Sequence, residues 1–388
     1  MQWQHRFWAY SWKIARIAVV VFVLLFVVLL SIIQFYVIPN VNRWRQDVAL
    51  DLAQQIGRSV SLDDIKAGWH DLHLHLTLSG LQVKDPAGHS LLKLQTTNVD
   101  IAWSSFILFR PYLFNLSVDE PVIFIHRDNQ GRLFVAGIRI MGQKSLKPGS
   151  FGDWLLHQRH LHVTHAQIVW KDDWRHVPPL TLNNVNLTIN NFAFRHAFSL
   201  SVTPPVHLAD PLSVSGVLYG HSLESPGSWH GRVSVDAPRL DLIRIKSYID
   251  YPFDIQSAIV GGSFSFRLAN RHLTSAHGQI DIRNLVARIK PRYAWLNINR
   301  LSSGFDFEWQ RKQAFSLTLS RLFLVQPQST LISKAAVLPA SFYLSVLHDN
   351  SFVYQVVARA DHLNLEDISR IVKAFPLPNG IQGWLYDY

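Results

Sequence analysis

The chain has 388 residues, of which 48% are hydrophobic and only 16% are charged. This composition excludes an intrinsically disordered chain and a coiled coil, since both need many more charged side chains. The absence of cysteine excludes disulfide scaffolds, thiolate metal sites and cysteine nucleophiles. The 37 Lys+Arg exceed the 27 Asp+Glu and give a formal charge of +10, which favours acidic partners such as lipid head groups or nucleic acid.

An uncharged stretch of Val, Leu, Ile and Phe runs from Ile17 to Ile38. A helix of this length crosses a hydrocarbon core of about 30 Å. A cleaved signal peptide is the alternative, but its apolar region would be shorter and would end in a small-x-small site, which this stretch lacks. We therefore predict a retained transmembrane helix over residues 14–38. Basic residues are slightly more frequent before it, which favours a cytoplasmic segment at 1–13 and a bacterial inner-membrane protein whose bulk is periplasmic.

The segment after the apolar stretch has helical spacing of its apolar residues, at Val41, Trp44, Val48 and Leu52. This spacing predicts a juxtamembrane helix over residues 39–57. Such a helix can lie at the membrane interface or cap the next sheet, and the second interpretation is the simpler one.

From Val60 onward apolar and polar residues alternate with a period of two, in about a dozen runs separated by turn signals. Strict alternation is typical of strands with one apolar and one polar face, so residues 58–388 are predicted to be mainly β and antiparallel. The residues expected on the apolar side are Leu72, Leu74, Leu76, Leu182, Leu187, Ile189, Phe264, Phe266, Leu317 and Leu319.

Helical stretches are few in this region, the clearest being Leu240–Ile249 and Leu365–Phe375. Each lies in an A-x-x-L-x-L-x-x-I pattern that follows a strand, which suggests an internal repeat. The chain stops at Tyr388 with no polar tail, which predicts truncation of a longer protein at its C-terminus.

Motifs for nucleotide binding, zinc proteolysis and serine hydrolysis are missing from the sequence, so we expect no enzyme and no cofactor. His73 and His75 could provide two metal ligands, and His160, His162 and His165 form a second cluster. No acidic third ligand is spaced to complete either set, so we interpret both as solvated faces of strands and predict no metal site.

Two pairs of adjacent acids, Asp63-Asp64 and Asp172-Asp173, are interpreted as solvated turn residues, because neighbouring side chains usually diverge. The basic cluster around Lys290 and Arg292 has aromatic neighbours that could stack on bases. A solvated loop is the better interpretation across a membrane from the cytoplasm, so nucleic acid is not an expected partner.

The order of these elements resembles a known family. An anchor and a short helix are followed by Gly57–Trp69, by the alternating run Leu72–Val83 and by a strand ending in Val99–Trp103. This order resembles the start of AsmA-like proteins of Gram-negative envelopes, most closely the YhdP type, and is most specific over residues 1–140.

The resemblance implies an elongated, curved β-groove, or β-taco, that carries phospholipid across the periplasm and supports the outer-membrane barrier. On that basis we expect a non-enzymatic lipid conduit with phospholipids, the inner membrane and possible envelope proteins as partners. The alternative is an envelope scaffold or assembly factor that binds partner strands along its sheet edges. Alternation alone does not distinguish an open groove from a closed sandwich, because it does not reveal what covers the apolar face.

Overall fold

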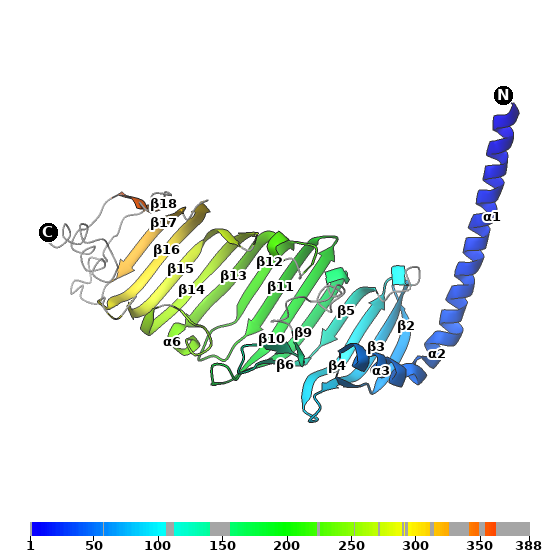
Figure 1. Cartoon of the computed structure of the whole chain (residues 1–388), viewed down its shortest axis with the longest axis horizontal. Helices are drawn as coiled ribbons and strands as arrows, with labels where there is room; N and C mark the ends of the chain where they lie inside the picture. The colour runs from blue at the N-terminus through cyan, green and yellow to red at the C-terminus, as the bar shows by residue number, and fades with distance from the viewer. Residues whose placement is uncertain are drawn as a thin grey trace. The chain divides into compact units, whose positions relative to one another are not determined.

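The computed structural model describes residues 2–56, 58–105, 112–139, 156–222, 226–251, 253–270, 272–288, 291, 294–310, 314–325, 341–348 and 354–361. The chain divides into two compact units, residues 1–116 and 117–388. Strands dominate both units, and helices are concentrated at the N-terminus, as the sequence predicts (Figure 1).

The N-terminal helix α1 covers Gln2–Ile32, so the segment predicted to precede the transmembrane helix is itself helical. It continues through a π-helical turn, η1 (Ile33–Val37), α2 (Ile38–Asn40), a 3-10 turn, η2 (Val41–Trp44), and α3 (Arg45–Ile56). Among the described residues, this is one helical segment long and apolar enough to cross a membrane. Its apolar side chains point into open space, with Phe22 68% exposed, which is consistent with a membrane-anchored protein.

The irregular turns between α1 and α3 have a cause in the sequence. Pro39 has no N–H and cannot donate to the carbonyl four residues earlier, so the regular ladder is interrupted around it. The Ile38 N–H bonds instead to the Ile33 carbonyl, the five-residue step of a π turn, and the Asn40 amide donates to the Tyr36 carbonyl at 2.8 Å.

Unit 1 contains a small antiparallel sheet. Its central strand β3 (His73–Lys84) pairs with β1 (Ser59–Ser61) and β2 (Asp64–His70) on one side and with β4 (Ser90–Ile101) on the other. Helix α3 packs on one end of the apolar face, where its Val48 and Leu52 contact a core that contains Ile65 and Val83. Helix α3 therefore caps the sheet, which is the simpler of the two roles predicted for it.

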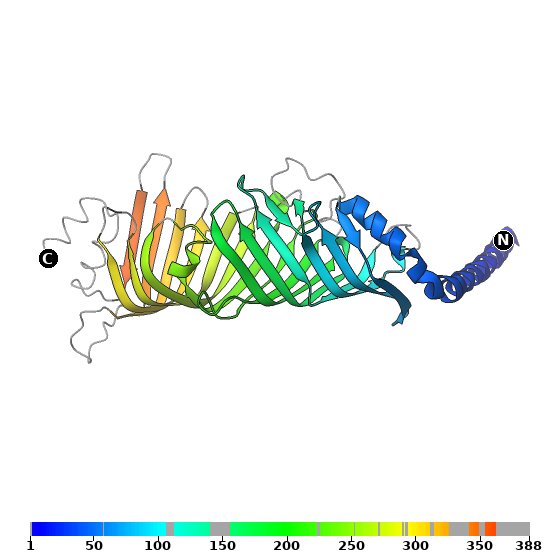
Figure 2. The same ribbon diagram turned by 90° about the horizontal axis from the view of Figure 1, so that it is seen from below.

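Unit 2 is a long ladder of neighbouring strands. Strand β5 (Leu113–Asp119) spans the junction between the units, and the strands that follow are β6 (Val122–Arg127), β7 (Leu133–Val135), β8 (Ile138–Arg139), β9 (His160–Asp172), β10 (Val177–Phe192), β11 (Arg195–Thr203), β12 (Leu212–Tyr219), β13 (His230–Asp241), β14 (Asp254–Ala269), β15 (His272–Arg288), β16 (Leu296–Gln310), β17 (Ala314–Val325), β18 (Ser341–His348) and β19 (Tyr354–Ala360). From β9 to β19 each strand pairs antiparallel with the next one in sequence. Figure 2 shows that strands of this ladder are bent along their length.

One pair in unit 2 departs from the antiparallel prediction, because β6 runs parallel to β9. Arg127 and Asp172 are directly paired in this register, and the guanidinium binds both carboxylate oxygens, with Nε donating to Oδ1 at 2.9 Å. Asp172 is only 1% exposed, so the prediction of a solvated turn residue is wrong for this acid. The Arg127 guanidinium also lies 4.8 Å from the centroid of the Trp174 ring.

The helix predicted at Leu240–Ile249 is present as α6, which covers Leu242–Ile245 and is shorter than predicted. The Asp241 carboxylate caps it by accepting a hydrogen bond from the Arg244 N–H at 3.3 Å. The predicted helix at 365–375, the second half of the suggested repeat and the chain end lie outside the described residues.

The Arg127–Asp172 pair predicts a stability effect with a defined pH dependence. Burial alone would raise the pKa of Asp172, but hydrogen bonds from Arg127 and the Arg175 N–H outweigh it and hold that pKa below its ordinary value of 3.8. The resulting stability is therefore present above pH 3.8 and is lost as pH falls toward the lower folded pKa. Asp172→Asn should lower the free energy of unfolding by about 3 kcal/mol near neutral pH, because Arg127 is left without its counter-ion, and should remove this acid-dependent component.

Urea unfolding followed by tryptophan fluorescence at several pH values measures both effects. Asp119→Asn is the matched control, because Asp119 also pairs with a basic residue, His165, but both side chains of that pair are exposed. An Asp172→Asn protein with unchanged stability would contradict this role of the pair.

Candidate functional site

Two rows of apolar residues cross unit 2 on one face of its ladder. Directly paired residues on neighbouring strands point to the same face, so the strand register defines each row. Row A consists of Leu187, Leu200, Val214, Val235, Phe264, Gly278, Phe305 and Leu319. Row B consists of Ile189, Phe198, Gly216, Val233, Phe266, Ala276, Phe307 and Leu317. Both rows therefore extend across eight consecutive strands, from β10 to β17.

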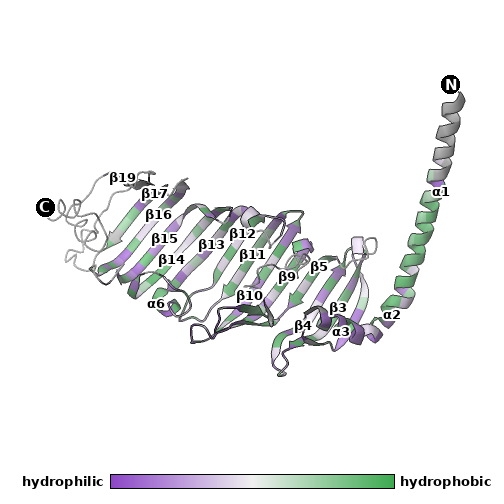
Figure 3. Ribbon diagram, in the orientation of Figure 1, coloured by the Kyte–Doolittle hydropathy of each residue, from purple (hydrophilic) through white to green (hydrophobic). Residues whose placement is uncertain are grey.

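The opposite face carries polar residues in equally regular rows. The row that lies between rows A and B along the strands consists of Thr188, Ser199, Ser215, Ser234, Ser265, His277, Asp306 and Thr318. Figure 3 shows the same alternation as hydrophobic and hydrophilic segments that succeed each other along the strands. From β10 to β17 the ladder thus has one apolar and one polar face along these rows.

The large side chains of rows A and B are half-buried rather than buried. In a closed sandwich, side chains at the centre of an apolar face would be sealed by the second sheet. The buried clusters that the described part of unit 2 contains are not at the middle of this face. One is centred on Ala166 and Val185 of β9 and β10, with Leu200 of row A at its edge, and one is centred on Ile298 of β16. The middle of the apolar face therefore remains partly accessible.

Small residues in the rows let aromatic rings from neighbouring strands converge. The ring centroids of Phe264 and Phe305 are 6.0 Å apart although Gly278 lies between them on the intervening strand. Strands two positions apart are separated by about 9.5 Å, so the two rings lean toward each other over the glycine. A Cβ at Gly278 would lie 2.1 Å from the Ser263 carbonyl oxygen and 3.0 Å from the Phe264 Cα. The glycine thus keeps the surface continuous and apolar at this point.

An apolar pocket of about 350 Å³ lies beside α6 at one border of the apolar face. It is lined mainly by Leu242 of α6 and by Val260, Ile280, Ile282 and Leu296 of β14, β15 and β16. Arg288 also lines the pocket, and its guanidinium lies 2.7 Å from the Asp254 carboxylate and 4.6 Å from the Trp295 ring centroid. The pocket combines an apolar wall with one cationic group.

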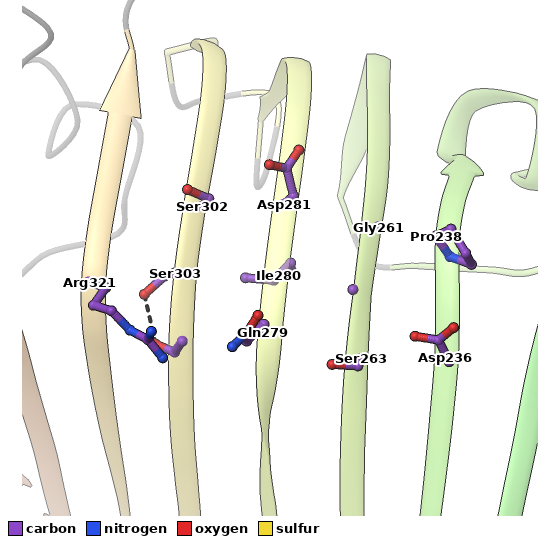
Figure 4. A pocket seen from close by; sticks show the side chains of 12 residues that line it. Asp236, Pro238, Gly261, Ser263, Gln279, Ile280, Asp281, Ser302, Ser303 and Arg321 are labelled. Atoms are coloured by element: carbon purple, nitrogen blue, oxygen red, sulfur yellow. Dashed lines mark hydrogen bonds between the residues drawn. The ribbon is translucent and has the colours of Figure 1, made fainter.

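A second pocket, of about 500 Å³, differs in chemistry. Asp236, Ser263 and Gln279 contribute to it from one polar cross-strand row, on three neighbouring strands (Figure 4). Burial alone would raise the pKa of Asp281, another residue of this pocket, but hydrogen bonds from Arg300 and Arg283 outweigh it and lower that pKa. This pocket suits water and ions rather than hydrocarbon.

The structure brings most of the sequence-predicted apolar residues together. Leu187, Phe264 and Leu319 lie in row A, and Ile189, Phe266 and Leu317 lie in row B. Leu182 is an odd number of residues from Leu187, which would place it on the other face of a straight strand. A register shift between Leu182 and Val185, with Asn184 at a φ of 48°, returns Leu182 to the cluster that contains Val185.

The three residues of unit 1 that are predicted on the apolar side differ in their burial. Leu74 is buried and Leu76 half-buried on β3, where they face Trp69 and Ala67 of β2. Leu72 lies in the turn between these strands with a φ of 65° and is 81% exposed, so the strand position predicted for it is wrong. The alternating pattern extends one residue too far at this hairpin because Leu72 belongs to the turn that reverses the chain.

Aromatic residues connect the anchor helix to the beginning of the unit 1 sheet. The Phe26 ring of α1 lies 5.5 Å from the Trp103 ring, which lies 6.3 Å from the Trp69 ring of β2. The Trp69 indole N–H donates to the Gln34 side-chain oxygen at 2.8 Å. Within unit 1, the apolar face is therefore adjacent to the helix predicted to lie in the membrane.

Comparison with known proteins identifies the family and supplies no further relative. The searches of curated proteins and of solved structures found no match. The model of the YhdP protein family matches residues 1–388, the full length of the chain. With its apolar N-terminal helix, its β-rich fold and this match, the chain belongs to the YhdP family.

Proposed function

We propose that the protein is a membrane-anchored, non-enzymatic lipid conduit whose apolar rows A and B hold phospholipid acyl chains. The observation that carries this proposal is the half-buried apolar face that continues across eight strands of unit 2. An accessible apolar face of this extent is unusual on a soluble monomer and typical of a surface that binds an apolar partner. Family membership supports an envelope-associated role.

Acyl chains are suited to this face because the rows have no hydrogen-bonding side chains. Transfer of each CH₂ group from water to such a surface gains about 0.8 kcal/mol, and this gain is the same at every position along a continuous row. A chain can therefore slide from one strand to the next without losing its contacts. Phospholipid head groups would remain in water at the border of the face, where Arg288 lies in an ion pair with Asp254.

The proposed location follows from the anchor. The apolar helix would lie in the inner membrane with its N-terminus in the cytoplasm and with the strands in the periplasm, in agreement with the distribution of basic residues around the helix. Transport between the inner and outer membranes would then contribute to the outer-membrane barrier. A source of energy and direction would have to come from a partner protein.

Photocrosslinking tests which partner covers the apolar face. A benzoylphenylalanine at Phe266, in row B, should crosslink to phospholipid in cells, because its ring lies where acyl chains are proposed to run. The same group at the adjacent Ser265, which points to the polar face, should give little lipid adduct. Mass spectrometry of the purified adducts measures both results. Crosslinks from Phe266 to protein alone would contradict the conduit and favour the scaffold.

A charge within the rows should block transport without unfolding the protein. Phe264→Asp and Leu187→Asp each place a carboxylate where a passing acyl chain would have to desolvate it, so lipid flux should fall at least tenfold, equivalent to about 1.4 kcal/mol or more. Flux of labelled phospholipid to the outer membrane is the measurement, made in cells that carry the substitution in their own copy of the gene.

The matched controls are Ser265→Asp and Thr188→Asp, which place the same charge on the polar face of the same strands. Both should transport normally. Circular dichroism and limited proteolysis show whether each variant is folded. A folded Phe264→Asp protein with normal flux would contradict transport along the rows.

Single-cysteine labelling tests the orientation, since the natural chain has no cysteine that would give background. A cysteine replacing Ser215, on the polar face of unit 2, should react with a membrane-impermeant maleimide once the outer membrane is permeabilised. Labelling that requires disruption of the inner membrane would reverse the proposed topology.

A further inference from the structure

Three potential metal ligands meet in unit 1, on the polar face of its sheet. They come from three adjacent strands: His70 from β2, His75 from β3 and Asp100 from β4. One ligand atom from each residue lies within 4.8 Å of the others. His75 and Asp100 are directly paired in the strand register, so their contact is fixed by the sheet itself.

The distances among these atoms are close to those of a metal site. His75 Nδ1 lies 2.6 Å from Asp100 Oδ1, and His70 Nδ1 lies 3.6 Å from Asp100 Oδ2. Tetrahedral zinc, with bonds of about 2.0–2.1 Å to nitrogen and oxygen, requires ligand atoms about 3.3 Å apart. The His75–Asp100 distance is shorter than this value and the His70–Asp100 distance is longer, each by less than 1 Å. Small side-chain rotations would bring both distances to it. The larger change falls on His75 and Asp100, whose ligand atoms would have to separate by about 0.7 Å, and the smaller one on the exposed His70 side chain.

The surroundings of Asp100 support an ion more than a simple His–Asp hydrogen bond. Asp100 is 4% exposed, and the Asn115 amide donates to its Oδ2 at 3.2 Å. The other polar atom of that amide, Asn115 Oδ1, is buried and has no hydrogen-bond partner among the described residues. A buried oxygen acceptor without a donor is unusual, and here it belongs to the amide that already contacts the ligand cluster.

Neighbouring residues explain which histidines belong to the cluster. His73, which the sequence pairs with His75, has its Nδ1 3.0 Å from the Asp71 carbonyl oxygen and stacks on the Phe114 ring at 4.2 Å. Gly68 lies opposite His75 and leaves open space where a Cβ would be, so the His75 and His70 rings can meet edge-to-face with their centroids 5.6 Å apart.

We propose that His70, His75 and Asp100 form a binding site for a divalent transition-metal ion, Zn²⁺ in the first instance. Two imidazoles and one carboxylate are a ligand set that zinc prefers, with a fourth position left for water. The ion would connect β2, β3 and β4 at the end of the sheet next to Trp69, whose indole bonds to Gln34 of the anchor segment. It would therefore clamp the sheet where the chain leaves the membrane.

Zinc titration of the purified full chain tests this site. The chain is produced without a polyhistidine tag, stripped with a chelator in detergent and titrated with Zn²⁺ against a chromogenic competitor. We expect saturation at one Zn²⁺ per chain, and at least about tenfold weaker binding for His70→Ala and for Asp100→Asn. Because His70 is largely exposed, His70→Ala should fold normally and report on the ligand role alone.

His165→Ala is the matched control. The His165 Nδ1 atom lies 3.1 Å from an Asp119 carboxylate oxygen, and this histidine–aspartate pair has no third ligand in the described structure. The substitution therefore removes a similar pair, and zinc binding should be unchanged. Cobalt gives an independent readout: the visible absorption of tetrahedral Co²⁺ should develop in the wild-type chain and be lost in His75→Ala. A wild-type chain without a saturable zinc site, or equal zinc binding by the wild type, His70→Ala and Asp100→Asn, would overturn the proposal.

Discussion

The central constraint on this protein is that the strands from β10 to β17 place the apolar residues of rows A and B on one face of the sheet. An apolar face across eight strands is stable in water only when something covers it. In unit 1, helix α3 provides part of that cover, and Ile65 and Val83 are buried beneath it. In unit 2, the large side chains of rows A and B remain half-buried. This difference in cover between the two units is the basis for the proposal that lipid binds along the rows.

The continuity of this face depends on local irregularities. Gly80 adopts a φ of 66° on β3, so Leu81 and Val83 return to the face that carries Leu78. A Cβ at that glycine would overlap the Asp63 carboxylate, at 1.9 Å from Oδ2. Bulges at Asn184 and elsewhere do the same for the long strands of unit 2. Without them, a strand of sixteen residues would turn part of its apolar side toward the polar face.

Much of the fold could be predicted from the sequence because alternation is a local property. The strands, their apolar residues and the N-terminal helix are each determined by patterns within about 20 residues. The parallel pairing of β6 with β9 could not be predicted, since it depends on the return of the chain across more than thirty residues. The meeting of His70, His75 and Asp100 was missed for the same reason: it becomes visible only when the register of three strands is known. The segments around Lys290 and after residue 361 lie outside the described residues, so what the sequence predicts for them is untested.

The most direct measurement of the central claim is native mass spectrometry of the full chain after extraction into a lipid-free detergent. If acyl chains cover rows A and B, the protein should retain phospholipid masses, and Phe264→Asp should retain fewer of them while keeping any lipid that is bound to the anchor helix. A chain that is free of lipid, or one whose bound lipid is unaffected by that substitution, would contradict the assignment of the apolar face to lipid.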